Sequence, residues 1–301
     1  MALLDLARPA AVLLKCLLLL GLAGSFFPAL AEGNATQDLL AKYASLEPQL
    51  RQNQFNRPLV LDSQETPSRV TGEVHAVVDY PFSDVSARLN DPDHWCDVLS
   101  LHINTKYCRA VITPGGTFLK VNIGKKTAEN LKDAARVEFT FTTATATPTY
   151  LEIKLSTKNG PMGTSDYRIN LKAIALPDAK SFLKLSYSYS MNFAARLAIQ
   201  TYLATAARHK VGFTPLGKAS DGQPIYIGGV RGLAERNTMR YYLAIDSFLA
   251  AGSEPPQGQL DKRLQTWFSA VERYPRQLHE LDRSEYLAMK REEYLRQQTA
   301  D

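Results

Sequence analysis

The sequence predicts an α+β protein in which a curved antiparallel sheet wraps a long helix and is followed by a helical appendage. Seven stretches between Val70 and Tyr189 alternate apolar and polar residues with period two, which is the pattern of half-buried strands. An Ala-rich amphipathic segment, Met191 to Lys210, comes directly after them at helical spacing. This order predicts that the Ala-rich helix closes the sheet.

One face of the predicted sheet is apolar and the other is polar. The inward positions carry no charge, whereas the alternate positions carry Glu73, His75, Lys120 and similar residues, as a solvated face would. The inward positions that we expect to contact a ligand are Val121, Phe139, Phe141, Tyr167, Leu185, Tyr187 and Tyr189. An apolar wall of this kind favours a hydrophobic ligand, and the tyrosine hydroxyls could orient it. The alternative for each tyrosine is core packing with its hydroxyl on a backbone carbonyl.

The first 31 residues read as a secretory signal peptide. Arg8 and Lys15 precede an apolar run that ends at Phe27, and Ala29-Leu30-Ala31 is a small-residue cleavage signal. We therefore expect cleavage after Ala31 and an exported protein, either periplasmic or secreted. The alternative is an uncleaved N-terminal anchor.

Changes in composition and pattern divide the chain into four predicted segments. Residues 1–31 are the signal peptide, 32–68 a helix (Ala35–Gln52) and a polar linker, 69–214 the sheet domain, and 215–301 a helical appendage. Within the sheet domain, Pro81–Leu89 reads as a short helix, Asn90–Asp93 as a turn, and Leu101–Ile112 as a strand. The appendage contains three predicted helices, Val230–Ala251, Gln259–Tyr274 and Ser284–Gln298.

Charge and cysteine content restrict the partners. The formal net charge is only +5, and the basic residues alternate with acidic ones, which argues against nucleic acid and leaves an anionic membrane surface open as a partner. Cys96 and Cys108 remain after cleavage, and an oxidising compartment favours a disulfide between them. Free thiols and a zinc site with His94 and His102 are the alternatives, although the spacing matches no standard ligand pattern.

The element order resembles the helix-grip fold of the START-like superfamily, which includes lipid-transfer START domains, plant pathogenesis-related proteins and polyketide cyclases. The likeness lies in the strand Val74–Tyr80, the segment Pro81–Val85, the Asp91–Trp95 sequence DPDHW and the helix Phe193–Lys210. It covers about residues 70–213. The resemblance implies a cavity between sheet and helix that holds an apolar ligand, with no assigned catalytic residue and no cofactor.

Two further residues could border such a cavity. Arg196 on the predicted closing helix could meet a carboxylate or phosphate group, and Trp95 could gate the mouth. The alternatives are a solvated helix face for Arg196 and a core position for Trp95. The polar and aromatic segment Glu235–Tyr242 either binds an anion or a partner through Glu235, Arg236 and Arg240, or forms an ordinary helix surface.

The predicted function is therefore non-catalytic binding of a lipid or another hydrophobic small molecule. The sequence contains no G-x-S-x-G, H-E-x-x-H, phosphate-loop or dinucleotide motif, and no metal ligand set. One alternative is a cyclase-like or hydrolase-like enzyme, and an inward-facing His102 or Arg109 would support it. The other is a protein-interaction module with a filled core.

Overall fold

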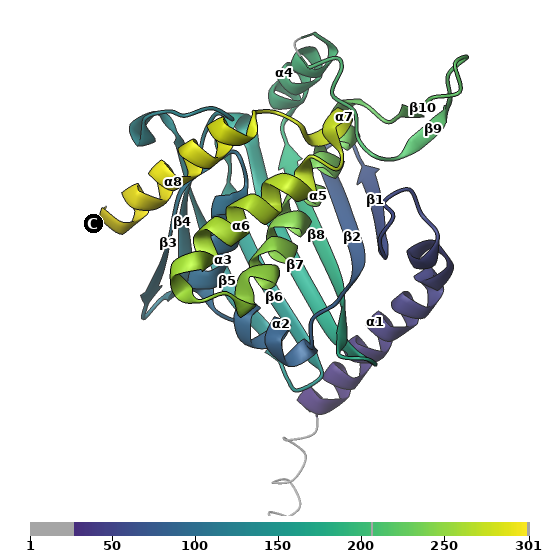
Figure 1. The fold of residues 1–301 in the computed structure, drawn as a ribbon, viewed down its shortest axis with the longest axis vertical. Coiled ribbons are helices and arrows are strands. Elements are labelled where there is room, and N and C mark those ends of the chain that lie inside the picture. The colour runs from purple at the N-terminus through teal and green to yellow at the C-terminus, as the bar shows by residue number, and fades with distance from the viewer. Residues whose placement is uncertain (1–26, 206, 300–301) are drawn as a thin grey trace, which may run out of the picture.

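Eight antiparallel strands form one curved sheet, and a long buried helix lies across its inner face (Figure 1). The computed structural model describes residues 27–205 and 207–299. In the main sheet the strand order is β1-β2-β8-β7-β6-β5-β4-β3. Its strands are β1 (Leu59–Glu65), β2 (Arg69–Val78), β3 (Thr105–Thr113), β4 (Gly116–Ile123), β5 (Ala135–Ala146), β6 (Tyr150–Asn159), β7 (Thr164–Leu176) and β8 (Lys180–Met191). The predicted α+β fold class and all seven alternating strands are confirmed.

The helices surround this sheet, and a small hairpin extends from it. The α-helices are α1 (Phe27–Arg51), α2 (Phe82–Leu89), α3 (Pro92–Leu101), α4 (Phe193–Ala204), α5 (Gly229–Ala250), α6 (Pro256–Val271), α7 (Pro275–Leu278) and α8 (Arg283–Thr299). Short 3₁₀ turns are η1 (Leu131–Asp133), η2 (Pro161–Gly163) and η3 (Ala251–Ser253), and the hairpin pairs β9 (Pro215–Lys218) with β10 (Pro224–Tyr226). Within the described residues, no helix is long and apolar enough to cross a bilayer. The predicted signal peptide lies largely outside those residues.

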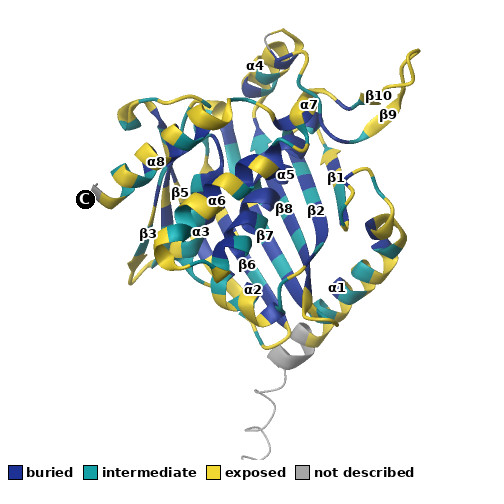
Figure 2. Ribbon diagram, viewed as in Figure 1, coloured by how far each residue is buried: buried dark blue, intermediate teal, exposed yellow. Residues whose placement is uncertain are grey.

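The helix that packs on the sheet is α5, so the expectation that Met191–Lys210 closes the sheet is wrong. In α5, 15 of 22 residues are buried, as the dark ribbon in Figure 2 shows. It lies so close to β2 that a Cβ on Gly72 would sit 2.2 Å from the Thr238 hydroxyl oxygen. By contrast, only Ala195 and Leu203 of α4 are buried. An Ala-rich helix has too little side-chain area to anchor it on a sheet, whereas α5 supplies Tyr242, Ile245 and Phe248.

Two local assignments also change. The linker expected between residues 52 and 68 contains strand β1. The apolar–polar alternation of this strand is obscured because one of its buried positions is the polar residue Ser63. Its hydroxyl donates a hydrogen bond to the Glu235 carboxylate at 2.6 Å. The predicted turn at Asn90–Asp93 starts helix α3 instead. Asp91 is its N-cap, accepting from the Asp93 backbone N–H at 2.8 Å, and Pro92 occupies the first helical position. The next strand therefore begins at Thr105 instead of Leu101.

The core is continuous from the sheet to the C-terminal helices. Inner-face residues such as Leu119 and Leu185 belong to the same buried cluster as Trp267 of α6 and Tyr286 of α8. A second, smaller cluster lies on the opposite face, where Leu46 and Leu50 of α1 cover Phe182. His75 is consequently 3% exposed instead of solvated, and its ring stacks on Phe182 with centroids 6.1 Å apart.

Candidate functional site

The predicted ligand-contacting strand residues do share the inner face of the sheet. Strand register places Phe141, Leu155, Ile169 and Tyr187 in one row across β5, β6, β7 and β8. Val121, Phe139 and Leu185 lie on the same face and are buried in the same core cluster. Because side-chain direction alternates along each strand, the period-two pattern was sufficient to place these residues.

Four tyrosines gather at one end of this face, and we call them the tyrosine cluster: Tyr167, Tyr187, Tyr189 and Tyr241 of α5. The rings of Tyr167 and Tyr189 stack at 5.1 Å, and those of Tyr187 and Tyr241 lie 5.3 Å apart. Burial raises the pKa of Tyr187 well above its ordinary value, so its phenol stays neutral. The Tyr167 hydroxyl donates to Thr164 Oγ1 at 3.0 Å. Because these phenols are neutral and their rings are apolar, this wall offers both apolar surface and hydrogen-bonding groups.

Burial is incomplete at two members of the tyrosine cluster. Tyr167 and Tyr241 are only partly buried, whereas Leu155, Leu171 and Leu185 are fully buried. The tyrosine cluster is therefore less completely buried than these leucines of the inner face.

Beside the tyrosines lies a group that we call the cationic cluster: Arg236 and Arg240 of α5, Lys126, Lys210 and the carboxylate of Glu280. Glu280 oxygens lie 2.8 Å from the Arg240 guanidinium, 2.7 Å from Lys126 Nζ and 3.2 Å from Lys210 Nζ. Burial alone would raise the pKa of Glu280, but these cations outweigh it and hold that pKa below its usual value. Four cations around one carboxylate give the cluster a formal charge of +3.

Arg236 and Arg240 are poorly compensated for charges so deeply buried. They are 3% and 2% exposed. Within the described chain, the Arg236 guanidinium donates one hydrogen bond, from Nη1 to the Val211 carbonyl at 3.2 Å. Burial and the neighbouring Arg240 lower the pKa of Arg236 to about 10, and Arg240 Nε is buried without a partner. Buried charge without compensation is costly, so this place favours an added anion.

His102 completes the site from the end of α3. It is 4% exposed, and its ring stacks on Tyr241 with centroids 4.7 Å apart. Its Nε2 is buried with no hydrogen-bond partner among the described residues. Burial, with Arg240 and Lys290 nearby, lowers the pKa of His102 well below its ordinary value, so the imidazole is neutral. Of the two residues whose inward orientation would support an enzyme, His102 is therefore buried, whereas Arg109 is exposed.

The other sequence-derived candidates lie elsewhere. Arg196 pairs with Glu65 and donates to the carbonyls of Thr66 and Pro67, both at 3.1 Å, so it fastens α4 to the β1–β2 hairpin. Trp95 is 1% exposed and donates from Nε1 to the Leu89 carbonyl at 2.7 Å, which makes it a core residue. Glu235 is fully buried and accepts hydrogen bonds from Ser63, Phe213 and Thr214.

Cys96 and Cys108 form a disulfide that joins α3 to β3, with Cα atoms 5.1 Å apart. The predicted pairing is thereby confirmed. No group of three or more metal-ligating side chains occurs in the part of the chain that the structure describes.

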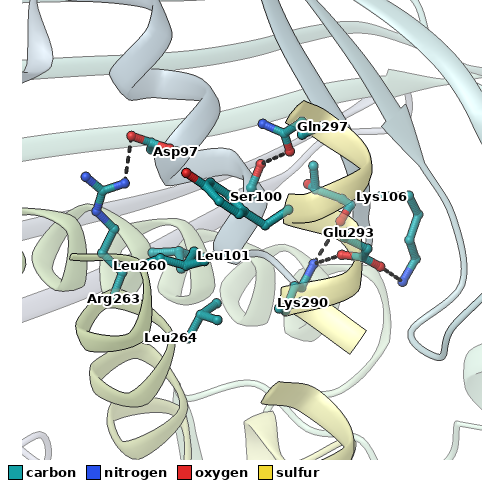
Figure 3. Close-up of a pocket in the computed structure, with 12 residues that line it drawn as sticks. Asp97, Ser100, Leu101, Lys106, Leu260, Arg263, Leu264, Lys290, Glu293 and Gln297 are labelled. Carbon is teal, nitrogen blue, oxygen red and sulfur yellow. Dashed lines mark hydrogen bonds and ion pairs between the residues drawn. The ribbon is translucent and has the colours of Figure 1, made fainter. Parts of the chain in front are cut away.

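A third group of charges, which we call the lysine pair, is Lys106 and Lys290 with Glu293 between them (Figure 3). Glu293 oxygens lie 3.0 Å from Lys106 Nζ and 2.8 Å from Lys290 Nζ. Lys290 also donates to the His102 and Thr105 carbonyls at 2.8 Å each. The adjoining cavity of about 20 Å³ has room for about one water molecule. This group fastens α8 to the α3–β3 connection and has no space for a ligand.

Comparisons with known proteins find similarity only among solved structures. No family model and no curated protein sequence match this chain. Its structure is similar to truncated norcoclaurine synthase from Thalictrum flavum, with 14% identity and a TM-score of 0.32 over 48% of this chain and 91% of that one. It is also similar to Ara h 8.0201 (15% identity, TM-score 0.36, 61% of this chain and 99% of that one). A third is the STAR-related lipid transfer protein fragment from Xanthomonas axonopodis (9% identity, TM-score 0.34, 49% of this chain and 86% of that one).

These three structures are at most 15% identical to this chain, with TM-scores of at most 0.36. They are too distant to assign a ligand or an activity, so both have to be inferred from the side chains of this chain.

Proposed function

We propose that this chain, after export, binds an apolar small molecule that carries an acidic group, without catalysing a reaction on it. The apolar body would lie on the tyrosine cluster and the adjoining inner face, and the acidic group would lie at Arg236. The observation that carries this proposal is the juxtaposition of partly exposed tyrosines with Arg236 and with three further cations that share one carboxylate.

The tyrosine cluster and the cationic cluster would contribute differently to ligand binding. Apolar surface removed from water contributes roughly 25 cal/mol per Å², which supplies affinity without direction. A carboxylate or phosphate at Arg236 would make charge-assisted hydrogen bonds and would compensate a buried charge at the same time. The cationic group therefore favours an acidic amphiphile, such as a fatty acid or an acidic lipid, over a neutral hydrocarbon.

The test compares two probes of equal chain length, palmitate and hexadecanol, by calorimetric titration. Palmitate should bind more tightly by about tenfold or more, equivalent to about 1.4 kcal/mol, because only palmitate carries a carboxylate. Arg236→Met should abolish this preference, whereas the matched control Arg196→Met removes an arginine that is paired with Glu65 and should preserve it. Native mass spectrometry of the purified protein should also detect a copurifying acidic amphiphile.

Failure of both probes to bind, with nothing extractable from the protein, would refute the proposal and favour an interaction module with a filled core. Equal binding of the two probes would keep the apolar site and remove the acidic group from the proposal.

One observation favours an enzyme as the second candidate function. The neutral His102 stacks on Tyr241 and has a buried nitrogen without a partner, which is an arrangement that can serve general acid–base catalysis. In that case the extracted ligand should change in mass on incubation with the protein. His102→Gln should stop the change while leaving palmitate binding within about twofold.

A further inference from the structure

The exposed apolar side chains of this protein are concentrated at one end. Among the described residues, eight large hydrophobic side chains are exposed, and six belong to α4, to η2 beside it or to the β9–β10 hairpin. These six are Met162, Phe193, Leu197, Tyr202, Leu216 and Ile225. Figure 1 shows α4 and the hairpin projecting beyond the same end of the sheet. Exposed apolar residues scattered singly need no explanation, but a group of this kind marks an interaction surface.

Helix α4 exposes an apolar face where a surface helix ordinarily exposes charge. Phe193 is 82% exposed and Leu197 is 54% exposed, and their spacing of four places them on one face. The opposite face buries Ala195 and Leu203. The only charged residue of α4 is Arg196, which is held by Glu65. Met162 is 90% exposed and adjoins this face, because the Asn192 backbone N–H donates to the Gly163 carbonyl at 3.3 Å.

Positive charge surrounds this apolar surface. From Asn192 to Ser220 the sequence contains no Asp or Glu, while Arg208 and Lys218 are exposed and Lys210 is half-buried. The nearest acidic residues along the chain are Asp178 before this stretch and Asp221 in the turn of the β9–β10 hairpin. Apolar side chains that can enter the acyl boundary, flanked by basic residues at headgroup depth, are the composition of a surface that lies on anionic lipid.

We propose that α4, η2 and the β9–β10 hairpin form a docking surface for an anionic phospholipid bilayer. Phe193, Leu197 and Met162 insert at the interface, and Arg208 and Lys218 contact the headgroups. Lys210 connects this surface to the cationic cluster through its ion pair with Glu280. Docking would therefore bring the cationic cluster toward the membrane, but the surface itself does not depend on any bound ligand.

Vesicle flotation tests the apolar part. The chain should float with vesicles of equimolar phosphatidylcholine and phosphatidylglycerol and remain behind with phosphatidylcholine alone. Phe193→Ser/Leu197→Ser should weaken binding to the anionic vesicles by about tenfold or more, equivalent to about 1.4 kcal/mol. Ile112→Ser is the matched control, because Ile112 is 76% exposed at the far end of β3 and should leave binding within about twofold. All variants carry the same N terminus, verified by intact mass.

The charge reversal Arg208→Glu/Lys218→Glu tests the basic part. It retains the apolar face and should abolish the preference for phosphatidylglycerol. Equal losses for Phe193→Ser/Leu197→Ser and Ile112→Ser, or no flotation of the native chain, would overturn the proposal. A second copy of this chain as the occupant would also overturn it, and light scattering would reveal this as a dimer that the double serine variant dissociates. Palmitate binding should be unchanged in the double serine variant, so failure here is distinguishable from failure of the proposed function.

Discussion

The lysine pair and the cationic cluster both adjoin the segment from His102 to Lys106, but buried charge is compensated in one group and not in the other. Each ammonium of the lysine pair has three acceptors: Lys106 donates to Ile103, Met289 and Glu293, and Lys290 to His102, Thr105 and Glu293. An ammonium has only three protons to donate. That group is therefore complete without any addition.

The cationic cluster is incomplete by the same standard. Arg236 has one hydrogen bond among the described residues, Arg240 Nε and His102 Nε2 are buried without partners, and three cations share Glu280. The comparison teaches that burial of charge does not by itself distinguish a structural ion pair from a binding site. The number of unsatisfied donors and the net charge do, and each of the following changes should affect the two groups differently.

The largest expected effect is at the centre of the lysine pair. Glu293→Gln leaves two buried ammonium groups without their carboxylate, so the free energy of unfolding should fall by about 3–5 kcal/mol. Urea unfolding followed by tryptophan fluorescence measures this. Glu292→Gln is the control, because Glu292 is 69% exposed and pairs only at the surface with Arg296, and it should change stability by less than about 0.5 kcal/mol. A similar small change for Glu293→Gln would show that the pair is not structural.

The disulfide comes next, because its loop contains the segment shared by both groups. Replacing Cys96 and Cys108 by serine removes a cross-link between residues 12 apart, which should lower the free energy of unfolding by roughly 3 kcal/mol. Loosening His102 to Lys106 should also weaken palmitate binding, measured by the same calorimetric titration. A stability loss without any change in binding would separate the segment from the cationic cluster.

The strands were predictable from the sequence because each has one buried and one solvated face, and period-two alternation records this difference directly. The sequence predicts the helix at Val230–Ala251 but places it in an appendage, and Glu235, Arg236 and Arg240 resemble an ordinary helix surface. In the structure these three side chains are at most 3% exposed. A helix that is buried on most sides is normally apolar all round, so charged residues that bind inside the protein give a misleading local signal.

The tyrosine cluster could be predicted in large part, and the cationic cluster could not. Strand parity placed Tyr167, Tyr187 and Tyr189 on one face. Arg236 and Arg240 were recognised as a possible anion-binding pair, but Lys126, Lys210 and Glu280 come from three separate connecting segments. No local pattern joins such positions, because their proximity arises only when α5 lies on the sheet.

Acidification should act on the molecule through two histidines, of which only His102 adjoins the cationic cluster. Burial lowers the pKa of His75 to about 4 and that of His102 well below 6.5. The unfolded chain takes up protons below about pH 6.5 while both native imidazoles stay neutral, so stability is complete above that pH and is lost as the pH falls. Each histidine should remove roughly 2 kcal/mol between pH 6.5 and 5.

Urea unfolding at the two pH values measures this loss. His102→Gln should remove about half of the pH dependence, and His75→Gln the other half. A pH dependence that persists in full in both variants would contradict the buried neutral state of these rings.

The smallest change in stability should come from removing a charge that lacks partners. Arg236→Met replaces a buried guanidinium by an apolar chain and leaves only the Val211 carbonyl without its donor, so the unliganded protein should be unchanged or more stable, by up to about 1 kcal/mol. Lys290→Met is the matched contrast, because it leaves two carbonyls without their donor and removes one of the two ammonium partners of Glu293, and it should cost about 3 kcal/mol or more. Equal destabilisation by the two methionines, measured by urea unfolding, would mean that Arg236 is as structural as Lys290, and the case for an anion at the end of α5 would fail with it.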